Sequence, residues 1–241
     1  MPAVDYRDEP TDHESQASRP GKFCKRLSLE AMSEFESLTA SLRCERNAVL
    51  FAEGDRPSRV LVLLEGGVRL SMNSSEGRRL TLGFAEPGDI LGLSAVISGC
   101  PYEITAEAQF PCGIAALPRQ AFLDFLLRCP VASQNVALQL SLENKKACEH
   151  LRILGLTLTA PEKLAHLLLE WCAEGQRAGR GARIHCSLTH EEIGECIGVA
   201  RETVSRTMAD LKSRELVEQH GSTLVISSLR ALEIYAGRFD C

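Results

Sequence analysis

The sequence predicts an α+β protein in which an all-β domain, a long helix and a C-terminal helix-turn-helix with a β-hairpin wing follow one another. Three observations predict this order. Over residues 48–117, apolar and polar residues alternate in short runs, as they do in half-buried strands. From Pro130 to about Leu156 the apolar period is helical, with no glycine or further proline before Gly155. Beyond Thr189, two short helical patterns separated by a glycine are followed by two short strand patterns.

Length and composition narrow the class of protein. The chain has 241 residues, which suits two domains of roughly 100 to 200 residues each. Hydrophobic residues make up 44% and charged residues 24%, which excludes collagen-like and wholly disordered chains. The longest apolar run, Val60 to Leu64, is far shorter than the ~20 residues that span a bilayer, so no membrane partner is expected. The N-terminal segment is acidic, which excludes a secretory signal and predicts a cytoplasmic protein.

The first part of the chain combines a polar tail with a β domain. Residues 1–20 are aperiodic and typical of a flexible tail, and the spacing from Leu27 to Leu42 predicts a short amphipathic helix. Glycine-containing turns then separate short strands, as in a sandwich or roll. The clearest of these strands are Val68–Met72, Leu80–Phe84 and Ile104–Ala106. The predicted parts are a tail (1–20), a sensor β-roll domain (21–129), a long helix (130–158) and a helix-turn-helix domain (159–241).

The apolar stripe of the long helix repeats in steps of three or four residues, the spacing of a coiled-coil seam. Its members are Val136, Leu140, Asn144, Ala147, Leu151 and Leu154. A helix of about 25 residues is about 38 Å long at 1.5 Å per residue, more than the β domain needs for its own cover. We therefore expect this helix to pair with a second copy of the chain. The alternative is a helix that packs only on its own domain.

A helix-turn-helix is predicted near the C-terminus. The capping-box sequence Thr189-His190-Glu191-Glu192 starts a short helix that Gly198 ends, and a second helix begins at Arg201. The inward face of this second helix consists of Val204, Met208 and Leu211. Two strand patterns around His220-Gly221-Ser222 then predict a wing. This order is the geometry that places a recognition helix in the major groove. The alternative is a solvated charged face on an ordinary helical hairpin.

The outward face of the second helix carries side chains suited to G·C pairs. They are Arg201, Glu202, Ser205 and Arg206. Arginine can bond a guanine edge bidentately, glutamate can accept from a cytosine amino group, and serine can reach a base or a phosphate. The whole chain has a net charge of −5, but residues 200–214 carry four basic and two acidic side chains. Nucleic-acid binding therefore depends on this helix.

Over residues 23–230 the sequence resembles the cyclic-AMP receptor protein and fumarate-nitrate regulator (CRP/FNR) superfamily of bacterial transcription factors. The motifs that carry the resemblance are Glu53-Gly54-Asp55, Leu64-Glu65-Gly66-Gly67-Val68, Pro87-Gly88-Asp89-Ile90-Leu91-Gly92, Glu191-Glu192-Ile193-Gly194, Ile197-Gly198 and Arg201-Glu202-Thr203-Val204-Ser205-Arg206. The resemblance implies a cyclic-nucleotide-binding-like β-roll, a long dimerisation helix and a winged helix-turn-helix. It also implies a homodimer that reads a palindromic site, with double-stranded DNA and RNA polymerase as partners.

The same resemblance assigns the DNA contacts. The residues concerned are Thr189, Arg201, Glu202, Thr203, Ser205 and Arg206. Arg201, Glu202 and Arg206 fall on base-reading positions, and Thr203 falls on a phosphate contact. Many members have serine or threonine where this chain has Ala200, so an N-cap and a phosphate contact are missing here. The expected site is an inverted repeat with a GTGA- or TGA-like core and half-sites about one helical turn apart.

The sensor domain departs from the members that bind cyclic nucleotides. Those members place a glutamate for the ribose hydroxyl after the glycine that follows Pro-Gly-Asp, and an arginine for the cyclic phosphate a few residues later. This chain has Leu93 and Ser94 after Gly92, and Glu103 would oppose a phosphate. We therefore do not expect cAMP to bind. The candidate effector region consists of Gly92, Leu93, Ser94, Tyr102, Glu103 and Thr105.

Other cofactors are not expected either. An iron–sulfur cluster needs about four converging thiolates, and only Cys24 lies in the N-terminal region where such a group is expected. Haem needs an axial ligand, and the candidates His150, His166 and Cys148 show no distinguishing spacing. No metal site is indicated, and the identity of the effector stays open.

Three other classes of protein compete with a DNA-binding regulator of this kind. The ten cysteines include no C-x-x-C pair, which favours free thiols, but a thiol-redox-responsive regulator stays open. Its candidate thiols are Cys100, Cys112, Cys129 and Cys148. A second alternative is a regulatory ligand-binding protein whose winged helix contacts protein, against which Arg201 and Arg206 argue. An enzyme is not expected, because the sequence has no H-E-x-x-H, P-loop, G-x-S-x-G or dinucleotide motif.

Overall fold

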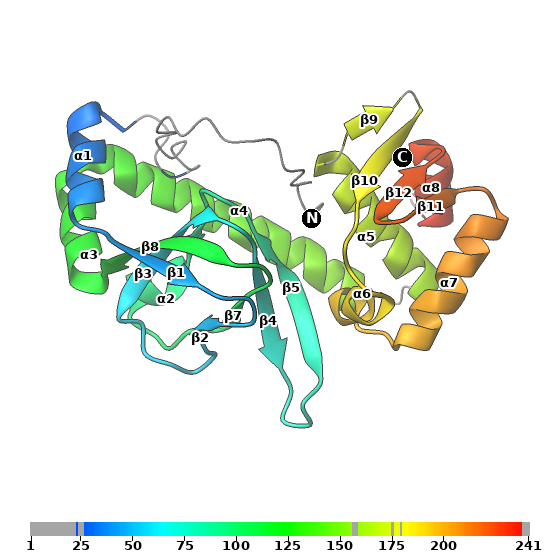
Figure 1. Ribbon diagram of the computed structural model, residues 1–241, viewed down its shortest axis with the longest axis horizontal. Helices are drawn as coiled ribbons and strands as arrows, with labels where there is room; N and C mark the ends of the chain where they lie inside the picture. The colour runs from blue at the N-terminus through cyan, green and yellow to red at the C-terminus, as the bar shows by residue number, and fades with distance from the viewer. Residues whose placement is uncertain (1–22, 24–26, 156–158, 175, 179, 238–241) are drawn as a thin grey trace. The chain divides into compact units, whose positions relative to one another are not determined.

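The computed structural model describes residues 23, 27–155, 159–174, 176–178 and 180–237. The expected N-terminal tail and the expected end of the long helix beyond Gly155 lie outside these residues. The chain divides into two compact units, one formed mostly by residues before Cys148 and one mostly by residues after it. Each unit has its own β-structure and its own helices (Figure 1).

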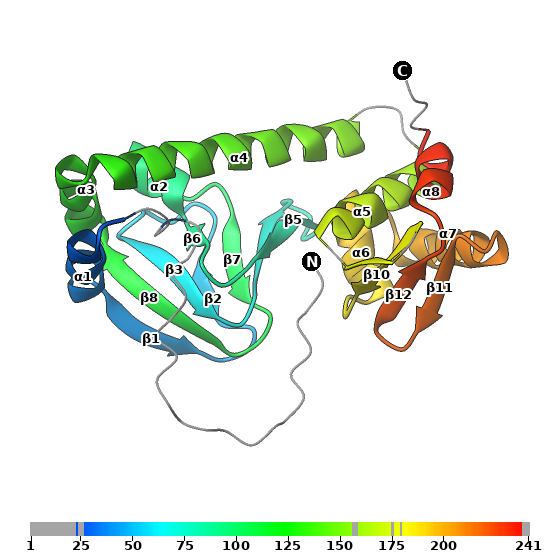
Figure 2. The same cartoon turned by 90° about the horizontal axis from the view of Figure 1, so that it is seen from above.

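The first unit is a β-roll of two four-stranded sheets, with orders β1-β8-β3-β6 and β2-β7-β4-β5. The strands are β1 Ala40–Cys44, β2 Val49–Phe51, β3 Arg59–Glu65, β4 Val68–Asn73, β5 Arg79–Ala85, β6 Ile90–Leu91, β7 Thr105–Ala108 and β8 Cys112–Pro118. The helices are α1 Leu29–Ser37, α2 Leu93–Ser98, α3 Arg119–Arg128 and α4 Pro130–Gly155. Figures 1 and 2 both show α1 and α3 side by side at one end of the roll.

The sheet that contains β3 is buried on both faces. Val60 and Val62 face a core shared with Phe122 and Phe125 of α3. Leu61 and its neighbours on the other face pack in a second core with the opposite sheet. A strand buried on both faces needs apolar residues at successive positions, which explains the uninterrupted run from Val60 to Leu64.

The short N-terminal helix is shorter than its spacing predicts. Ser28 caps α1, and the helix ends at Ser37. The prediction of helix up to Leu42 is wrong, because residues from Ala40 onward form β1 and pair with β8, where Leu42 lies opposite Ile114. The ladder of backbone hydrogen bonds to β8 decides the conformation here, and the helical spacing of apolar residues does not.

Helix α4 turns part of its predicted seam toward its own domain. Val136 is 5% exposed and packs in the core of the β-roll, and Leu140 is partly buried against the same core. These two residues therefore cover their own domain and are not part of a free face, contrary to the prediction. The rest of the predicted seam is exposed at Asn144, Ala147 and Leu151 (67%) and partly exposed at Leu154. Leu138 (61%) and Leu142 (52%) are exposed on another face of the helix. Within the described residues, no helix has the length and apolarity needed to cross a membrane.

The second unit is a winged helix-turn-helix with a four-stranded sheet of order β11-β12-β10-β9. Its helices are α5 Ala160–Glu174, α6 His190–Ile197, α7 Arg201–Ser213 and α8 Leu229–Tyr235. Its strands are β9 Gln176–Ala178, β10 Gly181–His185, β11 Val217–His220 and β12 Thr223–Ile226. The wing is the hairpin of β11 and β12, in which His220 lies opposite Thr223. Leu164, Leu168, Ile193 and Leu211 are fully buried and form part of the core beneath the helices.

Candidate nucleic-acid interface

The first helix of the helix-turn-helix begins with the predicted capping box. The Thr189 hydroxyl accepts from the backbone N–H of Glu192 at 3.2 Å, and the Thr189 N–H donates to Glu192 Oε2 at 2.8 Å. These two bonds satisfy donors that a helix N-terminus would otherwise leave unpaired. Thr189 is therefore a structural residue of α6.

The turn between α6 and α7 is set by two glycines. Gly198 ends α6 in the left-handed conformation, with φ of 67°. A Cβ atom on Gly194 would lie 2.5 Å from the carbonyl oxygen of Val199, so only glycine allows the turn to fold back this closely. The two helices are thus held at a fixed angle by backbone geometry.

Helix α7, drawn in orange in Figure 1, has one buried and one exposed face by the burial of its side chains. The buried residues are Val204, Thr207, Met208 and Leu211. Arg201, Glu202 and Arg206 are exposed. Among the described residues, no carboxylate forms an ion pair with Arg201 or Arg206, and Arg206 Nη2 donates only a long bond of 3.4 Å to the Thr203 hydroxyl. The two guanidinium groups are therefore free to meet an external acceptor.

The start of α7 lacks a side-chain cap, as the sequence predicts. Ala200 is the N-cap residue and makes no side-chain hydrogen bond. The N–H of Thr203 donates instead to the carbonyl oxygen of Ala200 at 3.0 Å. The Thr203 carbonyl in turn accepts from the Thr207 hydroxyl at 2.9 Å.

Ser205 has a partner that the sequence patterns did not predict. Its Oγ lies 2.8 Å from Nδ1 of His190, the first residue of α6. Burial, followed by the positive charges of Lys212 and Arg201, lowers the pKa of His190. The hydroxyl of Ser205 is therefore already engaged between the two helices, unlike the side chains of Arg201 and Arg206. The only sequence signal for this contact is the place of His190 directly after the N-cap.

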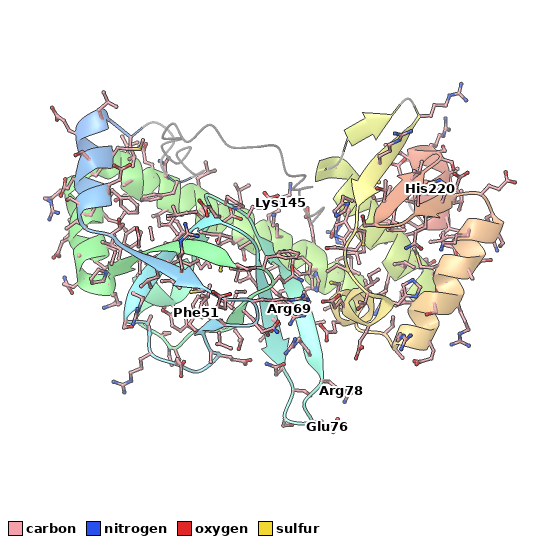
Figure 3. All side chains as sticks on the ribbon, in the orientation of Figure 1. Phe51, Arg69, Glu76, Arg78, Lys145 and His220 are labelled. Atoms are coloured by element: carbon pink, nitrogen blue, oxygen red, sulfur yellow. The ribbon has the colours of Figure 1, made fainter. Side chains whose placement is uncertain are left out.

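The C-terminal half of α7 is anchored on both sides. Lys212 Nζ donates to Gln219 Oε1 of the wing at 2.8 Å. The Tyr235 hydroxyl of α8 donates to Asp210 Oδ2 at 2.7 Å, and Arg214 Nε bonds the same carboxylate at 2.9 Å. The hydrogen bonds from Tyr235 and Arg214 lower the pKa of Asp210, while burial and Asp210 raise the pKa of Tyr235 to about 12. Figure 3 shows His220 on the wing that Lys212 contacts.

The candidate effector region of the β-roll is filled by the chain itself. Gly92 precedes α2 with φ of 74°, and a Cβ atom there would lie 2.6 Å from the Tyr102 ring. Tyr102 is 5% exposed and stacks on Phe51, labelled in Figure 3, with ring centroids 4.0 Å apart. Its hydroxyl donates to the carbonyl oxygen of Arg59 at 3.0 Å, and burial raises its pKa. Leu93 is also buried.

The polar residues of this region bond one another. The Ser94 hydroxyl donates to Glu103 Oε1 at 2.9 Å, and the Thr105 hydroxyl accepts from the backbone N–H of Glu53 at 3.0 Å. The structure thus brings Ser94 and Glu103 together. Within the described residues, no group of three potential ligands could hold a metal ion.

Two family models match the chain. The model of the cyclic nucleotide-binding domain matches residues 41–129, and that of the Crp-like helix-turn-helix domain matches residues 162–235. The fold and the order of the two units agree with these matches.

Similar proteins are transcription regulators. The chain is 30% identical to the nitrogen fixation regulation protein FixK of Bradyrhizobium diazoefficiens, over 90% of this chain and 89% of that protein. It is 29% identical to the transcriptional activatory protein AadR of Rhodopseudomonas palustris, over 90% and 87% of the two chains. It is 26% identical to the CRP-like cAMP-activated global transcriptional regulator of Mycobacterium tuberculosis, over 78% and 84%.

Solved structures share the fold. The structure of FixK2 from Bradyrhizobium japonicum aligns with a TM-score of 0.72 and 24% identity, covering 82% of this chain and 96% of that one. A mutant of CooA from Carboxydothermus hydrogenoformans aligns with a TM-score of 0.73 and 23% identity, covering 83% and 89%. The similar proteins are regulators and not enzymes, as the sequence predicts. The chain belongs to the CRP/FNR superfamily of DNA-binding transcription regulators.

Proposed function

We propose that this regulator works as a homodimer that reads an inverted repeat with a GTGA- or TGA-like core in each half-site. Each α7 enters the major groove of one half-site, and the half-sites lie about one helical turn apart. Arg201, Glu202 and Arg206 read base edges, while Thr189 and Thr203 lie near the DNA backbone. The dimer acts in the cytoplasm and contacts RNA polymerase at the promoter.

The observation that carries this proposal is the contrast between the two faces of α7. Its apolar face is buried, and on the exposed face two guanidinium groups flank Glu202 and pair with no carboxylate of the residues that the structure describes. The planar guanidinium group presents two donors in a fixed geometry, so it loses less side-chain entropy per hydrogen bond when it bonds guanine bidentately. Ser205 supports the interface indirectly, because its hydroxyl is held by His190.

Pairing of two copies is assigned to the outward face of α4. Val131, Leu138 and Leu142 are exposed and spaced by seven and four residues, so they share one face of the helix. Lys145, labelled in Figure 3, continues this stripe three residues later. In this proposal, a signal received by the sensor domain shifts the α4 pair and so the spacing of the two α7 helices.

The sensor domain is proposed to work without a cyclic nucleotide. A nucleotide in this fold needs room beside Gly92 and a cation for its phosphate. The Tyr102 ring occupies that room, and Glu103 supplies a negative charge where a positive one is needed. The residues present therefore do not fit the ligand for which this domain type is named.

Selection from a random duplex library tests the DNA proposal. The expected result is enrichment of an inverted repeat, with affinity that falls as salt rises, by about 0.9 log units per log unit of salt for each phosphate contacted. An unenriched library together with salt-independent binding contradicts the proposal. That outcome favours the alternative in which the winged helix contacts protein.

Sedimentation velocity tests the pairing face. Leu138→Lys places a charge in the proposed interface and is expected to shift the protein from dimer to monomer, since burying one leucine contributes about 1.5–3 kcal/mol. Leu127→Lys is the matched control, because Leu127 is 84% exposed on α3. Equal dimer fractions for the two variants would rule out this face.

A further inference from the structure

Two cysteines face each other across the edge of the first sheet. In the antiparallel pair of β1 and β8, Cys44 lies directly opposite Cys112. Side chains of directly opposite residues point to the same side of a sheet, with Cα atoms about 4.5–5.5 Å apart. That separation lies inside the range of about 4.4–6.8 Å that a disulfide requires.

The two side chains also pack in the same part of the β-roll. Cys112 is a buried member of the second core, and Cys44 packs partly buried against that core. The backbone of Gly66 also packs closely against Cys112. A Cβ atom added to Gly66 would lie only 2.8 Å from the Cβ of Cys112. The tight packing keeps Cys112 in place beside its partner, so no large backbone movement is needed to join the sulfur atoms.

We propose that Cys44 and Cys112 form a two-thiol redox site that a hydroperoxide oxidises to a cross-strand disulfide. The Cys44 sulfur attacks one oxygen of the peroxide, the O–O bond breaks, and Cys44 becomes a sulfenic acid as water (or an alcohol) leaves. The Cys112 sulfur then attacks the Cys44 sulfur and displaces a second water molecule. Together the two thiols lose two electrons and two protons, and the peroxide is reduced to water (or an alcohol) plus water.

The order of attack depends on burial. Cys44 is partly exposed at the end of the edge strand, whereas Cys112 is buried. Burial, followed by the proximity of Cys44, raises the pKa of Cys112 to about 11. A peroxide therefore reaches Cys44 first, and the buried thiol of Cys112, which lies opposite it in the strand pair, acts as the resolving thiol. This chemistry goes beyond the proposed DNA function and does not depend on it.

The other thiols of the sensor region are differently placed. Cys100 and Cys148 are exposed, and Cys129 is partly buried. Within the described part of the chain, none of these three lies opposite another cysteine in a strand pair, as Cys44 and Cys112 do. Exposure makes Cys100 reachable by oxidant without providing a resolving partner, which makes it a suitable control.

Peptide mapping of the full-length protein tests the site. The protein is treated with hydrogen peroxide, unfolded in N-ethylmaleimide and digested without reductant. The expected product joins the peptides of Cys44 and Cys112, with a mass about 2 Da below the sum of the two thiol forms. Cys100→Ser should keep this product, and Cys44→Ser should abolish it. A treated protein in which Cys44 and Cys112 both take up N-ethylmaleimide overturns the proposal.

A second measurement follows the oxidation state of Cys112 itself. In Cys44→Ser, where the altered residue is partly exposed, the buried Cys112 loses its peroxide-reactive neighbour. Its thiol should then stay reduced under the peroxide dose that oxidises it in the unaltered protein. Oxidation of Cys112 at an equal rate in both proteins would show that Cys44 plays no part. Circular dichroism confirms that the variant is folded.

Discussion

Two regions of this molecule share a backbone conformation and differ in the side chains that follow it. In both, a glycine in the left-handed conformation comes shortly before a helix, Gly198 before α7 and Gly92 before α2. After Gly198 the chain presents exposed Arg201 and Glu202. After Gly92 it buries Leu93 and packs the Tyr102 ring against the glycine. A glycine before a helix therefore borders a binding surface only where the neighbouring side chains are left free.

The charges of the two regions differ in the same sense. A phosphate near α7 would meet Arg201 and Arg206, which form no ion pair with a carboxylate of the described residues, whereas a phosphate near α2 would meet the Glu103 carboxylate. Ser94 already satisfies Glu103 at 2.9 Å. The side chains at the start of α7 can thus bind an external partner, whereas the side chains around α2 pack against one another.

The largest effect is expected at the aromatic stack. Tyr102→Ala removes a buried ring and should lower the free energy of unfolding of the β-roll by about 3–5 kcal/mol. Tyr102→Phe keeps the stack and loses only the bond to Arg59, so about 1 kcal/mol is expected. Urea unfolding followed by circular dichroism measures both. Calorimetric titration should detect no cAMP binding to either variant, and tight binding to Tyr102→Ala would show that the ring alone excludes nucleotides.

The next effect is expected on α7. Arg206→Ala should reduce discrimination between the selected site and a site altered at one G·C pair by about 1–3 kcal/mol, because one bidentate contact is lost. Arg230→Ala is the matched control, since Arg230 is exposed on α8 of the same unit. Fluorescence anisotropy with the two duplexes measures the difference. Equal discrimination by both variants would contradict base reading by Arg206.

A smaller effect is expected at the uncapped start of α7. Ala200→Ser supplies a hydroxyl that can accept from the N–H of Thr203, and should raise the free energy of unfolding by about 1 kcal/mol. Thr189→Ala removes the equivalent cap from α6 and should lower it by a similar amount. Fluorescence of Trp171, the single tryptophan and buried in α5, reports unfolding of this unit. A loss of stability in Ala200→Ser would show that the cap geometry is closed to a side chain.

The smallest effect concerns pH. Burial lowers the pKa of His190 below its ordinary value of 6.5, so the unfolded chain binds this proton more readily than the folded protein. The free energy of unfolding is therefore unaffected by His190 at pH values above the pKa of this residue in the unfolded chain. It decreases as the pH falls from there toward the lower pKa of His190 in the folded protein. Urea unfolding can be followed by Trp171 fluorescence at about pH 7.5 and at about pH 5.5. The difference between the two unfolding midpoints should be smaller in His190→Gln than in the unaltered protein. Identical differences would mean that His190 does not titrate in this range.

Several features of the fold were predictable because they depend on neighbours in the sequence. The Thr189 capping box, the Gly198 turn and the buried face of Val204 and Met208 are all products of local spacing, and each is confirmed. The uncapped position at Ala200 is confirmed for the same reason. The seam of α4 was not predictable in full, because the sequence marks Val136 as apolar without saying which surface it covers.

The sequence by itself determined the family, the order of the two units and the charged side chains offered by α7, since each is a matter of residue type and short-range spacing. Only the tertiary structure decided that Val136 faces its own core, that His190 holds Ser205, that the Tyr102 ring fills the space beside Gly92, and that Cys44 lies opposite Cys112. These are contacts between segments far apart in the chain or on different elements. Packing and strand register determine these contacts, and local sequence patterns do not specify packing or register.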